Sequence, residues 1–392
     1  MHKNLMAASA WWRAVLSMLG GAIAGAAIVH FGIKWFPRWF DLAGFDRADG
    51  LWLIVSLPVI FLLCIALHEL GHLAGAMMGG FRFRVLTIGP WTLIDDGVRL
   101  RHRLHLSVMR MIGGQQISSP PPGGATDRQF IVYLLGGGLA NVMAAGAAIA
   151  LASSLSMAPF WAAALLVFAC LNAFFGVINL LPLSTAAGIR TDGYQIRTLH
   201  KGGEDAVRFR AVFAVIALAY AGIRPREWPV EAVRDMVRGE MTPLERALAE
   251  LMRLQVALDR NDAADAASAA AHIVERYGSI PQAIRAQFAA ELTHYFAVMS
   301  GDAGAARRYA EDVSAGAYLI SPATVHRGKA AALFAEGRLD EALAEIDLGL
   351  SRQHLAMNEF DRQVEPEWLG QLKQSVMARQ LAQRSSPGTV SA

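Results

Sequence analysis

Residues 51–80 read LWLIVSLPVIFLLCIALHELGHLAGAMMGG, and the only ionisable side chains in this stretch are those of His68, Glu69 and His72. An α-helix needs about 20 apolar residues to cross the hydrocarbon core of a membrane, so this stretch predicts a transmembrane helix. Ionisable groups inside such a helix cost several kcal/mol and therefore usually serve a function. The stretch thus indicates both a fold class, the helical membrane proteins, and a first candidate site.

Three further apolar runs are long enough to span a membrane, and they cover residues 14–33, 130–157 and 159–183. The first run exceeds the roughly 7–15 residues of a signal-peptide core, so we interpret it as a signal anchor. A shorter run at residues 211–223 predicts a buried or surface helix, with a fifth span as the alternative. We expect a mostly α, polytopic membrane protein with about four transmembrane helices.

The composition agrees with this fold class. Of the 392 residues, 54% are hydrophobic and 18% are charged, whereas about a quarter are charged in typical soluble domains. A net charge of +3 over this length gives no basic footprint for nucleic acid, and two cysteines exclude a disulfide framework. These values disfavour an ordinary soluble enzyme, and we expect no nucleic-acid partner.

The positive charges of the loops predict the orientation in the membrane. Residues 81–129 carry seven arginines, and further Arg and Lys follow between residues 190 and 210. The loop at residues 37–50 has two Arg against three Asp, and the turn near residue 159 has no charge. The positive-inside rule then places the amino terminus, residues 81–129 and everything after residue 183 in the cytoplasm. We expect a multi-pass protein of the cell (inner) membrane with a cytoplasmic C-terminal domain.

Residues 81–106 alternate between apolar and polar side chains, as β-strands do. Asp96-Gly97 between two such runs predicts a β-hairpin in this cytoplasmic loop. We expect Val85 and Leu100 to share one face and the arginines between residues 99 and 103 to share the other. An exposed strand here could pair with an unwound polypeptide, and the alternative is a hairpin that only covers the site.

The chain beyond about residue 224 is charged, rich in Ala and periodic like helices. A turn followed by a helix start recurs at Asn261, Gly301 and Gly337, with spacings of 40 and 36 residues. These spacings lie near the 34-residue period of tetratricopeptide repeats. We interpret residues 246–383 as a TPR-like helical domain that binds a protein partner, with a plain Ala-rich bundle as the alternative. Residues 201–245 would then be a linker with one short apolar helix, and residues 384–392 a disordered tail.

His68-Glu69-Leu70-Gly71-His72 is an HExxH motif. Residues i and i+4 lie on the same face of a helix, so both imidazoles can reach one zinc ion. Glu69 lies beside them and can take a proton from a zinc-bound water. The motif occurs by chance in other proteins, but its place in an apolar helix favours a catalytic zinc site.

Two later segments extend the motif to a family resemblance. Asn179-Leu180-Leu181-Pro182 ends the fourth apolar run, and Asp192-Gly193 follows. Together with HExxH, these segments resemble the site-2 protease family of intramembrane zinc metallopeptidases over roughly residues 51–200. The resemblance implies that Asp192 is the third zinc ligand, which completes a His₂-carboxylate set with an open fourth position.

The resemblance has departures. The step from Asn179 to Asp192 is 13 residues, whereas the family usually has about eight, so the presentation of Asp192 is open. Gly136-Gly137-Gly138-Leu139-Ala140-Asn141 replaces the Ala-Gly-Pro-x-x-Asn of the family and keeps its Asn. Asn141 then either supports the substrate or the oxyanion, or bridges two helices, and Asn179 either shares this role or satisfies backbone freed by Pro182. The rival third ligands are Asp95, Asp96, His102, His105 and Glu204.

The sequence therefore predicts a zinc endopeptidase that cuts a transmembrane protein substrate in or near its membrane-spanning segment, in signalling by regulated intramembrane proteolysis. Its core would cover residues 51–200, preceded by an N-terminal helix and loop at residues 1–50. The competing hypothesis is a non-catalytic membrane scaffold with a structural zinc site and a partner-binding repeat domain. A transporter or zinc-sensing module is a third hypothesis, but the sequence lacks the paired half-repeats of transporters.

Overall fold

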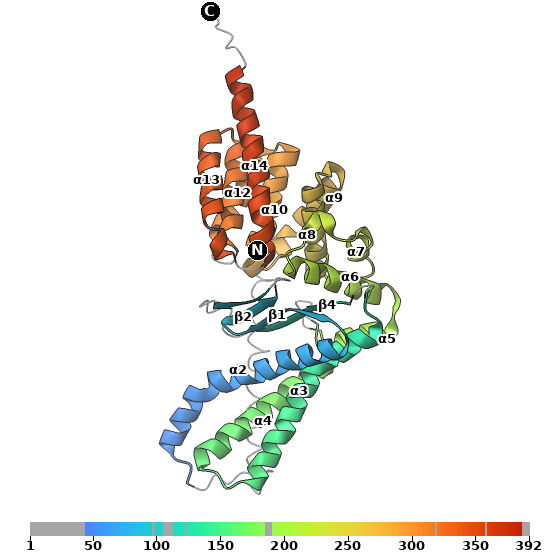
Figure 1. Ribbon diagram of the computed structural model, residues 1–392, viewed down its shortest axis with the longest axis vertical. Helices are drawn as coiled ribbons and strands as arrows, with labels where there is room; N and C mark the ends of the chain where they lie inside the picture. The colour runs from blue at the N-terminus through green and yellow to red at the C-terminus, as the bar shows by residue number, and fades with distance from the viewer. Residues whose placement is uncertain are drawn as a thin grey trace, which may run out of the picture. The chain divides into compact units, whose positions relative to one another are not determined.

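The computed structural model describes residues 44–95, 99–104, 113–121, 124–184, 190–317, 320–356 and 359–385. Several predictions lie outside these residues, namely the first apolar run at residues 14–33, Asp96-Gly97, His105 and the last seven residues of the predicted tail. Helices dominate the described chain, and they accompany one small antiparallel sheet (Figure 1). The predicted mostly α fold class is confirmed at this level.

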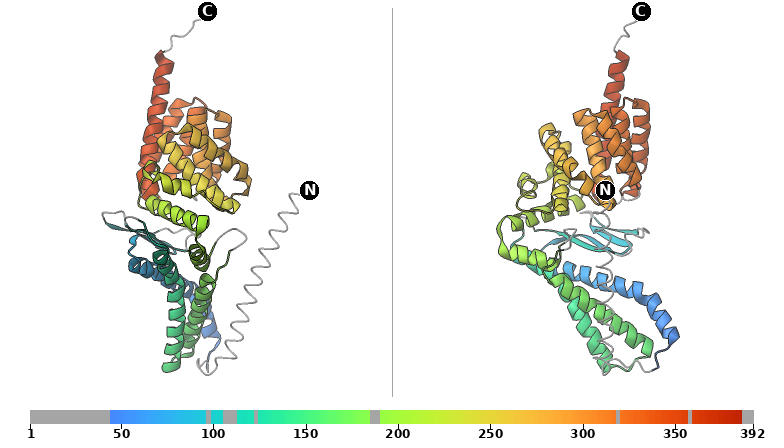
Figure 2. Two further views of the ribbon diagram at one scale, coloured as in Figure 1. Left: turned by 90° about the vertical axis from the view of Figure 1, so that its right-hand side faces the viewer. Right: turned by 180° about the vertical axis from the view of Figure 1, so that it is seen from behind.

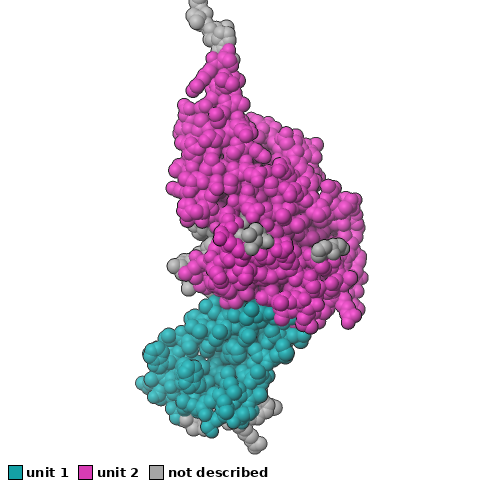
Figure 3. Space-filling model, viewed as in Figure 1, with its two compact units in different colours: residues 1–71, 136–180 teal, residues 72–135, 181–392 magenta. Residues whose placement is uncertain are grey.

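The chain divides into two compact units (Figure 3). One unit comprises residues 1–71 and 136–180, and the other comprises residues 72–135 and 181–392. The division falls within α2 (Arg47–Met78) and α3 (Asp127–Ser154), each of which is a continuous helix. His68 thus belongs to the first unit, and His72, one helical turn later, belongs to the second.

Three described helices are long and apolar enough to cross a membrane, and these are α2, α3 and α4 (Pro159–Leu180). They correspond to the predicted spans at residues 51–80, 130–157 and 159–183. In the first unit these helices pack through small residues, as membrane helices commonly do. A Cβ added to Gly71 would lie 2.3 Å from the carbonyl oxygen of Gly136, and one added to Gly176 would lie 2.9 Å from that of Gly138. Only glycine therefore allows these backbones to approach so closely.

The sheet belongs to the second unit and has the strand order β3-β2-β1-β4, with every pair antiparallel. The strands are β1 (Arg82–Ile88), β2 (Trp91–Asp95), β3 (Leu100–Leu104) and β4 (Gly114–Ser119). The predicted hairpin corresponds to β2 and β3, but the sequence signal at Asp96-Gly97 did not predict the two further strands.

The prediction that Val85 and Leu100 share a face is wrong. Val85 pairs with Ile94 and Ile94 pairs with Arg101, so Arg101 lies on the face of Val85. Leu100 lies on the opposite face and is 58% exposed. Alternation gives the period within each strand, but the turns between strands set the register, and a shift of one residue exchanges the faces.

Four helical segments follow α4 and lead to the C-terminal part of the chain. α5 (Asp192–Lys201) is followed by α6 (Gly203–Tyr220), η2 (Pro225–Glu227) and α7 (Val230–Asp235). Ala217 of α6 packs with Val85, Ile94 and Ile117 of the sheet, so α6 covers one sheet face (Figure 1). The run at residues 211–223 thus forms the second half of α6 and the turn after it, and the region predicted as a linker contains α6, η2 and α7.

The remaining helices form three successive hairpins and a final long helix (Figures 1 and 2). The hairpins pair α8 (Pro243–Arg260) with α9 (Ala263–Arg276), α10 (Gln282–His294) with α11 (Ala303–Ala315), and α12 (Pro322–Ala335) with α13 (Leu339–Ser351). The short helical segment η3 (Tyr277–Ser279) lies between the first two hairpins, η4 (Tyr295–Ser300) lies between α10 and α11, and η5 (Gln353–Leu355) follows α13. α14 (Glu359–Ser385) ends the described chain.

The recurring turns of the sequence are the turns inside these three hairpins. Asn261, Gly301 and Gly337 each have positive φ, at 55°, 73° and 79°. Asn and Gly tolerate this left-handed conformation best, which explains why they recur there. Asp262 and Asp302 follow and accept hydrogen bonds from the backbone N–H three residues later, which starts α9 and α11.

α14 closes the helical hairpins through a buried charged network. Arg327 of α12 is fully buried and donates to Glu365 of α14 at 2.7 Å and to Glu291 of α10 at 3.2 Å. Its guanidinium also stacks 4.7 Å from the ring of Trp368, whose Nε1 donates to Asp259 of α8. α14 is therefore tied to α8 and α12 by buried polar contacts as well as by apolar packing.

Candidate metal centre

α2 presents the three ionisable residues of the HExxH motif. Glu69 and His72 are buried, at 8% exposure each, and His68 is partly buried. The helix is unbroken from Arg47 to Met78, so His68 and His72 lie one turn apart on the same face. This spacing lets their imidazoles approach one metal ion, as the sequence predicted.

Asn141 of α3 fixes the orientation of His68. The side-chain oxygen of Asn141 lies 2.7 Å from Nδ1 of His68. The amide nitrogen of Asn141 donates to the backbone carbonyl of Cys64 at 3.0 Å and to the side-chain oxygen of Asn172 at 2.7 Å. Because both of those partners are acceptors, the amide oxygen of Asn141 must face His68 and accept its Nδ1–H. In the neutral imidazole the lone pair of His68 is then on Nε2, which is the nitrogen that could bind a metal.

The backbone carbonyl of Tyr133 in α3 fixes the orientation of His72. Nδ1 of His72 lies 3.0 Å from the carbonyl oxygen of Tyr133, which can only accept, so Nδ1 carries the proton. The ring of Tyr133 packs edge-on against His72, with ring centres 5.6 Å apart. The Tyr133 hydroxyl donates to the carbonyl of Gln116 in β4 at 2.8 Å. His72 is thus positioned by a residue that is itself anchored to the sheet.

Asp192 is the first residue of α5, directly after the capping residue Thr191. A carboxylate at this end of a helix is stabilised in its ionised form by the helix dipole. Its Oδ2 lies 3.4 Å from Nε2 of His72. Nε2 is the imidazole nitrogen that does not face the Tyr133 carbonyl, so this nitrogen and Oδ2 of Asp192 could bind the same metal ion.

The long connection from Asn179 to Asp192 is held together by hydrogen bonds between residues 183–184 and residues 190–191. Ser184 and Arg190 form an isolated antiparallel bridge, and Leu183 and Thr191 exchange hydrogen bonds of 3.1 Å. Leu183 and Thr191 therefore lie side by side, and Asp192 starts α5 directly after Thr191. The departure from the usual spacing does not keep Asp192 away from His72.

One group of at least three His, Cys, Asp or Glu side chains could hold a metal ion in the part of the chain that the structure describes. Its members are His68, His72 and Asp192, and their ligand atoms lie within 4.8 Å of one another. Two neutral imidazoles and one carboxylate are a donor set that Zn²⁺ accepts. The sequence-predicted ligand set is therefore brought together at these three residues.

The rival ligands that fall in the described residues have other contacts. Asp95 forms ion pairs with Arg82 and Arg84 of β1, and His102 stacks on Trp91 of β2. Glu204 lies in the first turn of α6. Asp96 and His105 are outside the described residues.

The two asparagines singled out in the sequence have different surroundings. Asn141 is fully buried and its three contacts bridge α2, α3 and α4. Asn179 donates to the carbonyl of Phe175 in its own helix at 3.0 Å. The contacts of Asn141 correspond to the helix-bridging alternative and add a contact to His68.

Sequence reasoning missed Asn172 and Tyr133. Asn172 is fully buried and donates to Sγ of Cys64 at 3.0 Å while accepting from Asn141. A lone amide in an apolar run is a signal that could have identified it. The contribution of Tyr133 is a backbone carbonyl, which leaves no trace in the sequence.

Comparison of the chain with known protein families, curated proteins and solved structures gives no match.

Proposed function

We propose that the chain is an intramembrane zinc metalloprotease of the site-2 protease type. The observation that carries this proposal is the convergence of His68, His72 and Asp192, whose ligand atoms lie within 4.8 Å of one another. Convergence alone would suit a structural metal as well. Glu69 separates the two cases, because it is a buried carboxyl group next to His68, and a structural site has no need of a general base.

The histidines fit zinc because of what holds them. Metal-binding imidazoles usually donate their second nitrogen to a carbonyl or carboxylate, which fixes the tautomer and the ring orientation. His68 has such a partner in Asn141 and His72 has one in Tyr133, at 2.7 Å and 3.0 Å. Zinc bound by three protein ligands would leave a fourth position for water and would supply the Lewis acid that activates it for attack on a carbonyl.

Glu69 carries the proton transfers in this proposal. It accepts a proton from the attacking water and later donates a proton to the leaving amine of the cleaved peptide. Its burial at 8% exposure limits competition from bulk water for these protons. Asn141 and Tyr133 act as positioning residues, because they hold His68 and His72 and have no direct part in bond cleavage.

The apolar surroundings support a membrane-embedded substrate. α2 has a mean hydropathy of 2.7 over its most apolar window, and side chains such as Trp52 and Ile54 are more than 60% exposed. An exposed apolar surface of this kind is suited to contact with lipid. A helical substrate must unwind before cleavage, since its carbonyls are otherwise engaged in backbone hydrogen bonds. β3 is an edge strand of the described sheet and could pair with the unwound segment.

The helical hairpins favour a protein partner on the side of the membrane that carries the arginine-rich loop. The positive-inside rule places that side in the cytoplasm. We propose that the hairpins recruit or regulate the substrate there, as repeat domains often present extended binding surfaces.

Glu69→Gln tests the proposal. The protein is reconstituted with a panel of single-span peptides that carry helix-breaking residues near one end, and cleavage is followed by mass spectrometry. We expect the wild type to cleave at least one peptide and Glu69→Gln to be slower by about 10²–10⁴-fold, the usual contribution of a general acid–base group. Zinc content should be the same in both proteins. Equal cleavage by the two proteins would refute the catalytic proposal, and zinc binding without cleavage by the wild type would favour the scaffold hypothesis.

A further inference from the structure

One face of α5 carries basic side chains that have no part in the proposed proteolysis. Arg197, His200 and Lys201 are all exposed. Residues three and four positions apart lie on the same side of a helix, so these side chains share one face, which we call the basic face. Their side chains form no hydrogen bond or ion pair within the part of the chain that the structure describes. The basic face is therefore open to an anion from outside the chain.

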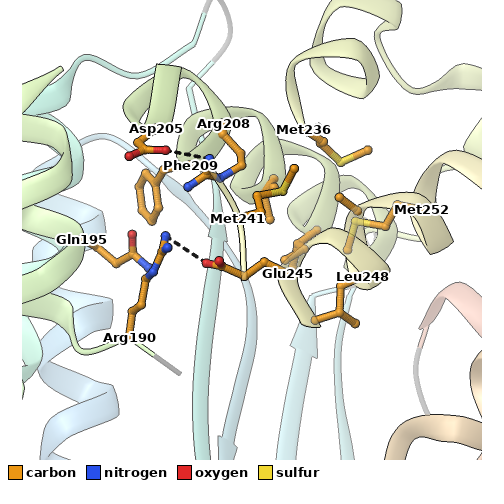
Figure 4. A pocket seen from close by; sticks show the side chains of 13 residues that line it. Arg190, Gln195, Asp205, Arg208, Phe209, Met236, Met241, Glu245, Leu248 and Met252 are labelled. Atoms are coloured by element: carbon orange, nitrogen blue, oxygen red, sulfur yellow. Dashed lines mark ion pairs between the residues drawn. The ribbon is translucent and has the colours of Figure 1, made fainter. Parts of the chain in front are cut away.

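The other sides of α5 are covered by the protein. Leu199 is buried in an apolar cluster, and Ile196 packs against the same cluster. Gln195 faces a cavity of about 250 Å³ that α5 shares with α6 and α8 (Figure 4). The basic face is thus the side that α5 turns away from the rest of the second unit.

The contacts of α5 show where it lies along the membrane-spanning helices. Asp192, its first residue, lies 3.4 Å from His72 of α2. Towards its other end, Leu199 clusters with Ala76 in the last turn of α2 and with Phe130 in the first turn of α3. A helix of this length extends about 15 Å. α5 therefore runs from the level of the candidate metal ligands to the level where α2 ends and α3 begins.

The chain changes from apolar to charged at this level. Met78 ends α2 and is 81% exposed, and the first charged residue after it is Arg82. On α3, Arg128 directly precedes the apolar run that starts at Phe130 by two residues. Such a change marks the edge of the hydrocarbon core, where the lipid headgroups begin. The basic face lies on the same turns of α5 as Leu199, and hence at the depth of the headgroups.

Neighbouring acidic groups leave the basic face with a net positive charge. Asp205 of α6 pairs with Arg208 at 2.7 Å, as Figure 4 shows, so its charge is already matched. Glu204, also in the first turn of α6, is the nearest acidic residue after α5 in the sequence. Arg197 and Lys201 together exceed this one negative charge.

We propose that the basic face of α5 binds the phosphate headgroup of an anionic phospholipid. Guanidinium and ammonium groups form charge-assisted hydrogen bonds with phosphate oxygens. The aliphatic stems of Arg197 and Lys201 can lie along apolar surface while their charged ends reach the headgroup. Basic residues beside a membrane favour anionic over zwitterionic lipids.

The proposal depends on the location of α2, α3 and α4 in a membrane and is independent of catalysis. A bound headgroup would hold the last two turns of the helix that presents Asp192 at its first residue.

The probe for the test is dioleoyl phosphatidylglycerol, titrated into the full chain in lauryl maltoside micelles, with bound lipid counted by native mass spectrometry. Dioleoyl phosphatidylcholine has the same chains and a zwitterionic headgroup. We expect the first phosphatidylglycerol to bind at least about 10-fold more tightly than phosphatidylcholine. Glycerol phosphate, which is the headgroup without its chains, should not compete at equal concentration. Competition by glycerol phosphate would assign the face to a soluble anion and contradict the proposal.

Paired variants locate the site. The double variant Arg197→Gln and Lys201→Gln should weaken phosphatidylglycerol binding by about 10- to 30-fold, and the charge-preserving double variant Arg197→Lys and Lys201→Arg should retain most of it. The matched control, Arg307→Gln and Arg308→Gln, removes two exposed charges from α11 and should bind like the wild type. Unfolding transitions check that each variant is folded.

Three results would overturn the proposal. The first is equal affinity of the wild type for the two lipids. The second is undiminished phosphatidylglycerol binding when Arg197 and Lys201 are both replaced by Gln. The third is an equal loss in the α11 control, since that loss would reflect the total charge of the chain and not the basic face.

Discussion

The metal centre and the helical hairpins both bury charged or polar groups, but they arrange them in opposite ways. In the hairpins, Arg327 lies against Glu291 and Glu365, so each buried carboxylate has a counter-charge within hydrogen-bond distance. At the metal centre, Nδ1 of His68 bonds to Asn141 and Nδ1 of His72 bonds to the Tyr133 carbonyl, and both imidazoles converge with Asp192. Buried charges that pair with one another hold helices together, whereas buried side chains that converge on one point can bind a metal ion.

The first way to test this contrast is to remove the central charge of the hairpins. Arg327→Met should lower the free energy of unfolding by about 3–5 kcal/mol, because Glu291 and Glu365 would remain buried without a counter-charge. The measurement is thermal or urea unfolding of the purified full chain. Arg338→Met is the matched control, since Arg338 pairs with Glu336 and Glu341 at the surface, where solvent screens such pairs and they contribute little to stability. A similar loss in both variants would contradict a structural role of the buried network.

The second test addresses the support of the metal ligands. Asn141→Ala removes the acceptor that orients His68, and it should weaken zinc binding by about 10- to 100-fold, as is usual for such partners. Competition with a fluorescent chelator measures the affinity. Asn179→Ala is the matched control, because the side chain of Asn179 bonds only within α4 among the contacts described, and its zinc affinity should stay unchanged. Equal affinities in Asn141→Ala and wild type would remove Asn141 from the site.

The third test follows a gradual change with pH and concerns Asp361 of α14, which bonds to Ser321. Burial, together with repulsion from Glu365 and Glu291 and opposed by Arg327, raises the pKa of Asp361 to about 7. The folded chain then holds this proton at pH values where the unfolded chain, with a pKa near 3.8, has lost it. The stability due to Asp361 is complete below about pH 4 and is lost as the pH rises towards 7, by up to about 1.4 kcal/mol per pH unit.

Asp361→Asn should remove this dependence, because an amide resembles the protonated acid. The measurement is the difference in unfolding free energy between wild type and variant at pH 5, 6 and 7. We expect the wild type to lose stability relative to the variant as the pH rises. A constant difference over this range would show that Asp361 does not retain its proton on folding.

Much of the metal centre and of the helical hairpins could be predicted, because local sequence determines these features. The i, i+4 spacing of His68 and His72 needs only a helix, and the turns at Asn261, Gly301 and Gly337 need only residues that tolerate positive φ. The position of Asp192 was predicted by resemblance, and the bridge between Ser184 and Arg190 shows how the longer connection still presents it.

The remainder depends on distant residues meeting in three dimensions. The contacts of His68 with Asn141 and of His72 with the Tyr133 carbonyl join residues 73 and 61 positions apart. The register of the sheet placed Leu100 on the unexpected face, because alternation does not determine cross-strand pairing. Glu291, Arg327 and Glu365 each resemble ordinary surface charges in the sequence, and only the packing of α12 against α10 and α14 reveals that they are buried.

The most direct test of the central claim is the zinc content of purified protein by mass spectrometry, for wild type, Glu69→Gln, His72→Ala and Asp192→Ala. Wild type and Glu69→Gln should each hold about one zinc per chain, since Glu69 is not a ligand, and the two ligand variants should lose most of it. Folding of each variant is checked by its unfolding transition. Unchanged zinc in Asp192→Ala, or no zinc in the folded wild type, would contradict a centre built from His68, His72 and Asp192.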